Sequence, residues 1–274
     1  MSSISWTSTT SGNWNTGSNW SGGSPPTATD DVTINTSASI TVTYSSGSAA
    51  VLSLTTGSND TLLITGGKLA IDGNATMYGL VSESGGTFTL AGAHYAMNGG
   101  LNQSAGTVRI ASGTLTLANS STIGGTISGA ALNLSGGNDS IAASAALSVA
   151  ELALTGANVT LSTNLAETGI FAMTSGVLSA GTNNVSLTGQ ASLLGGIVTG
   201  SGSLTLGGAT EMNANVFEGD LKISNTGTVD QTGYSYIGYN GTDVVTFTNA
   251  HGALWRLDGD TTLYGNASTA IANA

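Results

Sequence analysis

The sequence predicts an all-β fold, a right-handed parallel β-helix (β-solenoid) with an aromatic N-terminal cap. The main indication is a short unit in which two apolar residues stand two positions apart, so that both point to one side of an extended strand. The stretch AGTVRIASGTLTLA (105–118) holds two copies of this unit, at 106–111 and 113–118. A second indication is that 41 of the 274 residues are glycine, which disfavours long helices and permits corners between short strands.

Similar units recur about every 20 residues, which indicates stacked coils of three short strands and three turns. An array of antiparallel sandwiches is the alternative, but its hairpins would show repeated Asn-Gly or Asp-Gly turns. Right-handed coiling follows from the general rule for parallel crossovers. We expect the paired apolar residues of the units to form the core: Phe88, Leu90, Val108, Ile110, Leu132, Leu134, Leu152, Leu154, Val185, Leu187, Leu204 and Leu206.

Residues 1–29 differ from the rest of the chain, and we expect them to form an N-terminal cap. They contain three of the four tryptophans, Trp6, Trp14 and Trp20, and both prolines. Large rings directly before the first regular strands favour a cover over the open end of the core. In the alternative interpretation, Trp14 and Trp20 are ligand-binding residues on which sugar rings stack.

Residues 30–274 are expected to form the β-helix, with aromatic-rich C-terminal coils from about residue 228. Tyr234, Tyr236 and Tyr239 lie close together in this region. Tyr234 and Tyr236 are two positions apart, so both would project from one side of a strand. The three tyrosines form either an exposed ligand-binding patch or part of an aromatic stack inside wider coils.

The opening of the chain combines Trp6, the segment GNWNTGSNWSGG (12–23), Pro25, Pro26 and the strand DDVTI (30–34). It resembles the start of large bacterial exported β-strand-repeat proteins, which include autotransporter-type passengers and large surface adhesins. The Gly-Thr-Leu units that follow resemble the stalk repeats of these proteins. The resemblance implies a right-handed β-helix that is displayed on the bacterial cell surface or shed from it, with a role in adhesion or biofilm formation.

Two stretches are similar to calcium-binding nonapeptide repeats, GSNDTLLI (57–64) and GGNDSIAA (136–143). In such repeats, Asp carboxylates and turn carbonyls of consecutive coils surround the ion. Asp60 and Asp139 are therefore candidate calcium ligands, and Asp258 and Asp260 are a second candidate pair. Alternatively, these residues form simple turns in which the side chains bond to the local backbone. We expect no cofactor other than calcium.

The composition argues against nucleic-acid and membrane partners. The formal net charge is −11, from 15 acidic and 4 basic residues. Lys68, Arg109, Lys222 and Arg256 stand singly, whereas binding to phosphates or to anionic lipids requires clustered cations. No apolar run reaches membrane-spanning length, so we expect no membrane insertion by this segment.

The function predicted from the sequence is structural or adhesive: a β-helical stalk or display segment of a bacterial secreted or cell-surface adhesin, with a cell-surface glycan or protein as partner. A carbohydrate-binding module that uses the Trp or Tyr residues is the first alternative. A polysaccharide-active β-helix enzyme, a lyase, epimerase or hydrolase, is the second. It has weaker support because His94, His251 and the four cations stand singly, and such chemistry needs a base beside a charge that neutralises the substrate.

The last residues, YGNASTAIANA (264–274), read as further repeat without a cap. A solenoid end exposes unpaired strand edges that must be covered. We therefore expect more coils to follow Ala274 in the natural protein, or self-association through the uncapped C-terminal coil.

Overall fold

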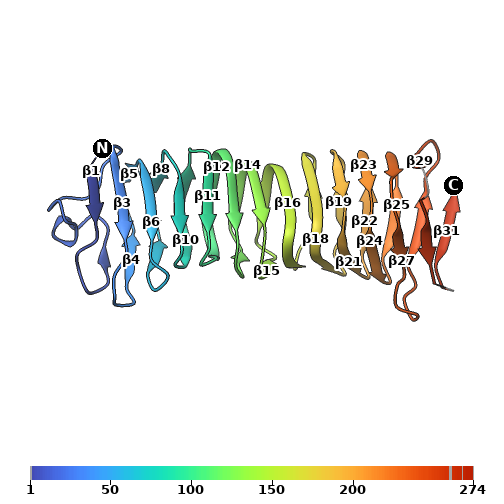
Figure 1. The fold of residues 1–274 in the computed structure, drawn as a ribbon, viewed down its shortest axis with the longest axis horizontal. Coiled ribbons are helices and arrows are strands. Elements are labelled where there is room, and N and C mark those ends of the chain that lie inside the picture. Colours follow the sequence, from blue (N-terminus) through green and yellow to red (C-terminus); the bar gives the residue numbers. More distant parts are fainter. Residues whose placement is uncertain (1, 259–260, 267, 274) are drawn as a thin grey trace. The chain divides into compact units, whose positions relative to one another are not determined.

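The computed structural model describes residues 2–258, 261–266 and 268–273. The fold is all-β, as predicted, with 61% of the chain in strands and parallel coils stacked into a β-solenoid of about 12 turns (Figure 1). The chain divides into two compact units, unit 1 (residues 1–137 and 144–149) and unit 2 (residues 138–143 and 150–274). In the described part of the chain, the only helix is the 3₁₀ turn η1 (Gly17–Asn19), and no helix is long and apolar enough to cross a membrane.

Each regular coil of unit 1 contributes to three parallel ladders, as the 20-residue period predicted. The first ladder contains β1 (Ser2–Ser5), β3 (Asp30–Ile34), β6 (Ser53–Thr56), β9 (Ala75–Met77), β11 (His94–Met97), and parts of β12 (Leu101–Leu117) and β14 (Thr126–Leu134). The second contains β2 (Gly12–Asn13), β4 (Thr41–Tyr44), β7 (Thr61–Ile64), parts of β10 (Val81–Leu90) and β12, and β13 (Thr122–Ile123). The third contains β5 (Ser48–Val51), β8 (Lys68–Ile71), and parts of β10, β12 and β14.

Unit 2 is also built from three parallel ladders. The first contains parts of β16 (Ala146–Leu161) and β18 (Ile170–Gly181), then β20 (Ala191–Leu193), β23 (Ala209–Met212), β26 (Thr228–Gln231) and β29 (Leu254–Leu257). The second contains β15 (Asn138–Ile141), parts of β16 and β18, β21 (Gly196–Gly200), β24 (Asn215–Gly219), β27 (Ser235–Ile237) and β30 (Leu263–Gly265). The third contains β17 (Leu165–Glu167), β19 (Val185–Leu187), β22 (Ser203–Leu206), β25 (Lys222–Asn225), β28 (Thr246–Asn249) and β31 (Ala270–Asn273).

The core consists of apolar side chains stacked in columns, and all twelve residues predicted for it are buried, none more than 2% exposed. The 20-residue spacing of the units gives the order of the columns only in part. Phe88 pairs with Val108 as the spacing indicated, but Val108 then pairs with Ile127, while Leu132 pairs with Leu115. The reason is that each coil repeats the apolar unit on several faces, so that the next similar unit in the sequence can belong to a different face.

One corner of unit 1 requires glycine in four consecutive coils. Gly47, Gly67, Gly86 and Gly106 each precede a strand segment of the third ladder, and their φ angles lie between 74° and 89°. Side chains other than glycine rarely adopt this left-handed region. A Cβ atom on Gly86 would also lie 2.8 Å from the carbonyl oxygen of Gly67, too close for van der Waals contact. The glycine of the repeated unit therefore turns the chain and allows the coils to approach.

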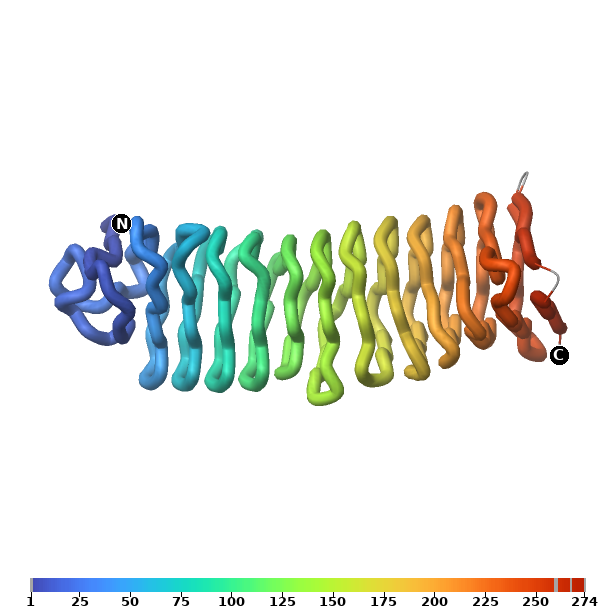
Figure 2. The backbone as a smooth tube through the Cα atoms, turned by 90° about the horizontal axis from the view of Figure 1, so that it is seen from below, coloured from blue at the N-terminus to red at the C-terminus, as the bar shows by residue number. Residues whose placement is uncertain are grey.

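The N-terminal segment forms the predicted aromatic cap, which appears in dark blue as an irregular fold before the regular coils of unit 1 (Figure 2). Trp6 and Trp14 each pack edge-on against Trp20, with ring centroids 5.0 and 4.9 Å from its own. The ring of Trp14 also contacts Tyr44 of β4, with centroids 6.2 Å apart. Because β1 and β2 pair with β3 and β4, the cap is an enlarged first coil that continues the ladders.

Asp30 fastens the cap to the first regular strand. Its carboxylate accepts hydrogen bonds from the Ser2 hydroxyl at 2.5 Å and from the N–H and hydroxyl of Thr27, both at 2.8 Å. These bonds, that of Ser2 foremost, hold the pKa of Asp30 below its usual value. The carboxylate therefore remains ionised and joins two segments that are far apart in the sequence.

Candidate functional site

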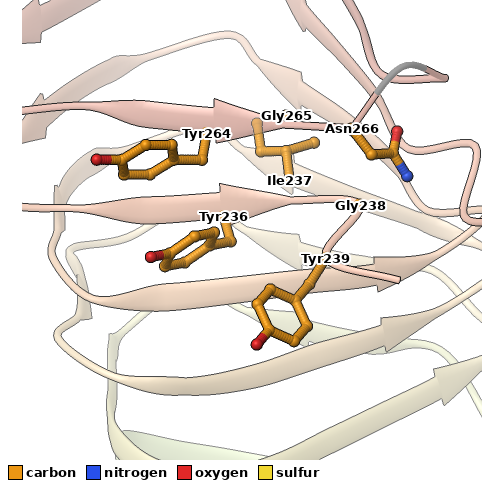
Figure 3. Close-up of a pocket in the computed structure, with 7 residues that line it drawn as sticks. All are labelled: Tyr236, Ile237, Gly238, Tyr239, Tyr264, Gly265 and Asn266. Carbon is orange, nitrogen blue, oxygen red and sulfur yellow. The ribbon is translucent and has the colours of Figure 1, made fainter. Parts of the chain in front are cut away.

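Four exposed tyrosines lie together on the last coils of unit 2, and we call them the tyrosine cluster: Tyr234, Tyr236, Tyr239 and Tyr264. Figure 3 shows the last three of them. Tyr236 on β27 and Tyr264 on β30 are paired neighbours in the second ladder. Tyr234 directly precedes β27, and Tyr239 follows it and is 64% exposed. Of the two alternatives left open by the sequence, the interior stack is wrong for Tyr234 and Tyr236, which are 52% and 38% exposed. Ligand binding by the three predicted tyrosines stays a prediction.

The four rings contact one another. The rings of Tyr236 and Tyr264 are stacked, with centroids 4.9 Å apart and planes 17° apart. Tyr239 meets Tyr236 edge-on at 5.5 Å, and Tyr234 lies tilted against Tyr264 at 6.1 Å. In Figure 3 the hydroxyl groups of Tyr236 and Tyr264 project to the same side, away from their strands. The cluster therefore combines aromatic surface with a row of hydroxyl groups.

A hollow of about 280 Å³ lies beside these rings. It is lined by Tyr236, Ile237, Gly238, Tyr239, Tyr264, Gly265 and Asn266. The Asn266 side-chain amide donates hydrogen bonds to the carbonyl oxygens of Asn240, at 2.8 Å, and Asp243, at 3.0 Å. Asn266 thus ties the loop after β27 to the turn after β30, and this tie holds the floor of the hollow in place.

The tyrosine cluster also ends a column of apolar side chains on the outer surface of unit 2. In successive coils Val177 pairs with Ile197, Ile197 with Val216, and Val216 with Tyr236. All three aliphatic residues are partly exposed, because alternate residues of their strands point outward. The outer surface therefore presents a continuous apolar strip that leads to the two stacked rings.

The structure contradicts the alternative in which Trp14 and Trp20 bind sugars. Their side chains are 0% and 2% exposed. Their rings contact each other, and the Trp20 indole N–H donates to the Trp14 carbonyl oxygen at 2.6 Å. A sugar ring needs an accessible aromatic face, and neither tryptophan has one, because both fill the interior of the cap.

The candidate calcium ligands occupy unlike surroundings. The carboxylate of Asp60 is buried and accepts hydrogen bonds from the N–H and hydroxyl of Thr36, at 2.9 and 2.8 Å. These bonds join neighbouring coils rather than the local turn, and an ion would have to replace them. Asp139 points into the interior from β15 of unit 2. Asp258 is exposed, and Asp260 lies outside the described residues.

Two buried glutamates are further titratable groups that the sequence reasoning did not single out. Burial raises the pKa of Glu83 and of Glu167 to about 7. Glu83 accepts hydrogen bonds from the Gln103 amide at 2.8 Å and from the Thr107 N–H at 3.0 Å, and these partly oppose the rise. Within the described residues, Oε1 of Glu167 has no hydrogen-bond partner. Both side chains occupy buried positions of strands in which buried and more exposed residues alternate, as the core residues do.

The groups considered for catalysis remain dispersed. His94 borders a hollow of about 250 Å³ in unit 1, which Asn74, Thr76 and Thr114 also line, and the described residues around it include no carboxylate. In the described part of the chain, the one ion pair joins Arg256 to Asp230. No three His, Cys, Asp or Glu residues among those described lie close enough to hold a metal ion.

The last described coil leaves core-facing side chains exposed. Leu257 and Ile271 continue the columns of Gln231 and Phe247, yet both are exposed. Together with Trp255 they line a hollow of about 320 Å³. Self-association through this coil stays a prediction.

Tyr264 is the member of the tyrosine cluster that the sequence reasoning did not assign to a site. It lies well beyond the usual coil length from Tyr236, because the coils widen here. The enriched aromatic content after residue 228 was the available signal, but it does not separate outward from inward rings. Phe247 and Trp255 from the same region pack together on the inner side, with centroids 4.2 Å apart.

Comparison of this chain with protein-family models, with curated proteins and with solved structures finds no match.

Proposed function

We propose that this chain is a β-helical stalk or display segment of a bacterial secreted or cell-surface adhesin, structural or adhesive rather than catalytic. The observation that supports it most is the continuity of the three ladders within each unit. Within each unit, backbone hydrogen bonds link the described regular coils to their neighbours, and apolar columns fill the interior. In such a solenoid each coil is stabilised by the coils on either side of it, which suits an extended spacer.

The outer surface also suits an exported protein that needs no disulfides. The chain has no cysteine, and stacked coils do not depend on cross-links for stability. Outward-facing hydroxyl residues such as Thr33, Thr55 and Thr76 pair in consecutive coils of unit 1. Such ladders keep a sheet surface hydrated with few charges. In this proposal the partner is a glycan or protein of a cell surface.

The proposal is tested by removing one coil in register. Val185 pairs with Leu204, so deletion of residues 185–203 joins equivalent positions of neighbouring coils. The matched control deletes only 185–193 and joins different faces. Each variant is fused between a surface anchor and a C-terminal epitope on bacterial cells, and the epitope is detected with antibody on intact cells.

A stalk tolerates a change in the number of coils, so we expect the 185–203 deletion to display the epitope as well as the parent. The 185–193 deletion should lose display, because it reverses which residues face the core. Loss of display in both variants would contradict the proposal. So would turnover of a polysaccharide by the purified parent chain.

A further inference from the structure

We propose that the tyrosine cluster binds a neutral polysaccharide, with one sugar ring seated in the hollow beside Tyr236, Tyr239 and Tyr264. This inference rests on the adhesive part of the proposed function, for which it names the ligand class and the site; the sugar titration can fail while the coil-deletion test of the stalk succeeds. The exposed cluster is an unusual feature on a solenoid surface that elsewhere carries mostly small and hydroxyl-bearing residues. Exposed apolar surface of this kind commonly marks a binding site.

The chemistry of the hollow matches the two-sided character of a sugar ring. A pyranose presents C–H groups on its faces and hydroxyl groups around its rim. Tyr239 and Tyr264 supply aromatic surface, and the tyrosine hydroxyls supply donors and acceptors at the edge. Gly238 and Gly265 in the floor have no side chains to fill the space. Apolar walls with a few polar groups are the usual composition of small-ligand sites.

The charges around the hollow favour a neutral ligand over an acidic one. None of the described residues lining the hollow is charged. Two acidic groups accept hydrogen bonds from the loop after β27: the Asp243 carboxylate accepts from the Asn240 N–H, at 3.3 Å, and the Asp220 carboxylate accepts from the Val244 N–H, at 3.2 Å. A carboxylate sugar would be repelled by both. The charges therefore disfavour uronate polymers as the ligand.

The size of the hollow and its surroundings indicate a chain rather than a single sugar. A volume of about 280 Å³ is at the lower limit of ligand pockets, which commonly have about 300–1,000 Å³. The outer column of Val177, Ile197 and Val216 leads directly to Tyr236. Further sugar units therefore have an apolar strip on which to lie.

The site is organised before the ligand arrives. Besides the two hydrogen bonds from Asn266, the Thr269 hydroxyl donates to the Ile237 carbonyl oxygen at 2.9 Å. The stack of Tyr236 on Tyr264 fixes both rings. A site that is already ordered loses less conformational entropy on binding, so a small contact area suffices for measurable affinity.

The experiment titrates the full chain with cellohexaose, xylohexaose and mannohexaose by calorimetry, and follows tyrosine fluorescence. Hexagalacturonate serves as the acidic probe and hexalysine as the cationic one. The variants are Tyr239→Ala, which lies in a loop, and Tyr264→Ala. The matched control is Tyr78→Ala, because Tyr78 is a 53% exposed tyrosine of unit 1. Circular dichroism and melting temperature establish that each variant is folded.

We expect at least one neutral hexasaccharide to bind, and to bind at least tenfold more weakly to folded Tyr239→Ala and Tyr264→Ala. Tyr78→Ala should bind within twofold of the parent. Absence of binding by all three neutral sugars would overturn the proposal. Equal loss in Tyr78→Ala, or preferential binding of hexagalacturonate or hexalysine, would also overturn it. The corresponding disaccharide should bind several-fold more weakly than its hexasaccharide, and equal affinities would refute the role of the valine and isoleucine column.

Discussion

Replacing Glu167 by glutamine should stabilise the protein at pH 8 and leave its stability unchanged at pH 4.5. Glu167 is 3% exposed, and its paired neighbour in the adjacent coil is Leu187. Within the described residues, Oε1 has no hydrogen-bond partner. An ionised carboxylate in such surroundings loses hydration without compensation, and burial is the cause of its raised pKa.

The size of the effect follows from the pKa. Folding raises the pKa of Glu167 from 4.5 to about 7, so the folded state binds this proton more tightly than the unfolded state. The free energy of unfolding is therefore highest below pH 4.5, where the Glu167 carboxyl is protonated, and it falls as the pH rises to about 7. At about 1.4 kcal/mol for each pH unit, the loss is about 3 kcal/mol. In a domain of this size range it corresponds to a shift of roughly 6–12 °C in melting temperature.

The assay is thermal unfolding of the parent and Glu167→Gln between pH 4.5 and pH 8, followed by circular dichroism. Glu83 titrates in the same range in both proteins, so the difference between their melting temperatures isolates Glu167. Glu211→Gln is the control, because Glu211 is exposed on β23. If the difference between parent and Glu167→Gln is the same at both pH values, the desolvation argument is wrong.

Three further substitutions test the core, the cap and the second buried carboxyl. Leu134→Asp should lower stability by at least about 4 kcal/mol, because it buries an unpaired charge; a melting temperature within about a degree of the parent would refute the solenoid core. Trp14→Ala should cost about 3–5 kcal/mol as the cap loses its largest buried ring, measured by urea unfolding; unchanged stability with loss of sugar binding would instead restore the platform interpretation. Glu83→Leu should destabilise the protein by about 1–3 kcal/mol for each donor left without an acceptor, whereas Glu167→Leu should stabilise it. If urea unfolding shows a change in stability of the same sign for both variants, the assigned hydrogen bonds of Glu83 are wrong.

The sequence was sufficient for the core because burial in a solenoid depends on local alternation. A residue such as Leu134 is buried when it occupies an inward position of its own strand, whichever coil follows. The order of the columns depends instead on the length of every turn between two strands. Small differences in turn length move Leu132 to the column of Leu115 rather than to that of Val108. Similar units on several faces leave this order undetermined by spacing alone.

The candidate binding residues were predicted less completely than the core, and the reasons differ between the tyrosines near the end of the chain and the tryptophans of the cap. Two-residue alternation placed Tyr236 on the same side as Tyr234, but it does not tell whether that side faces solvent or the interior, so both alternatives stayed open. Trp14 and Trp20 could not be placed in this way, since their segment contains only short strands and a 3₁₀ turn. Aromatic residues in such a segment are equally consistent with burial inside a cap and with a platform for a sugar ring, and only the three-dimensional contacts distinguish the two.

The candidate site lies where the regular repeat is interrupted, and the physics of the fold explains this position. In a regular coil every residue is constrained by the coils on both sides, so outward positions accept small residues that fit the ladder. The segment that follows β27 is longer than a regular turn and is released from that constraint. It places Tyr239 beside rings that the ladder holds at fixed spacing, and Asn266 directly follows β30 on the same side. A rigid ladder beneath and irregular loops above are the combination from which binding sites are commonly built. Because the coils are longer here, the 20-residue repeat does not predict the pairing of Tyr236 with Tyr264. A break in the repeat pattern is therefore itself an indication of the site.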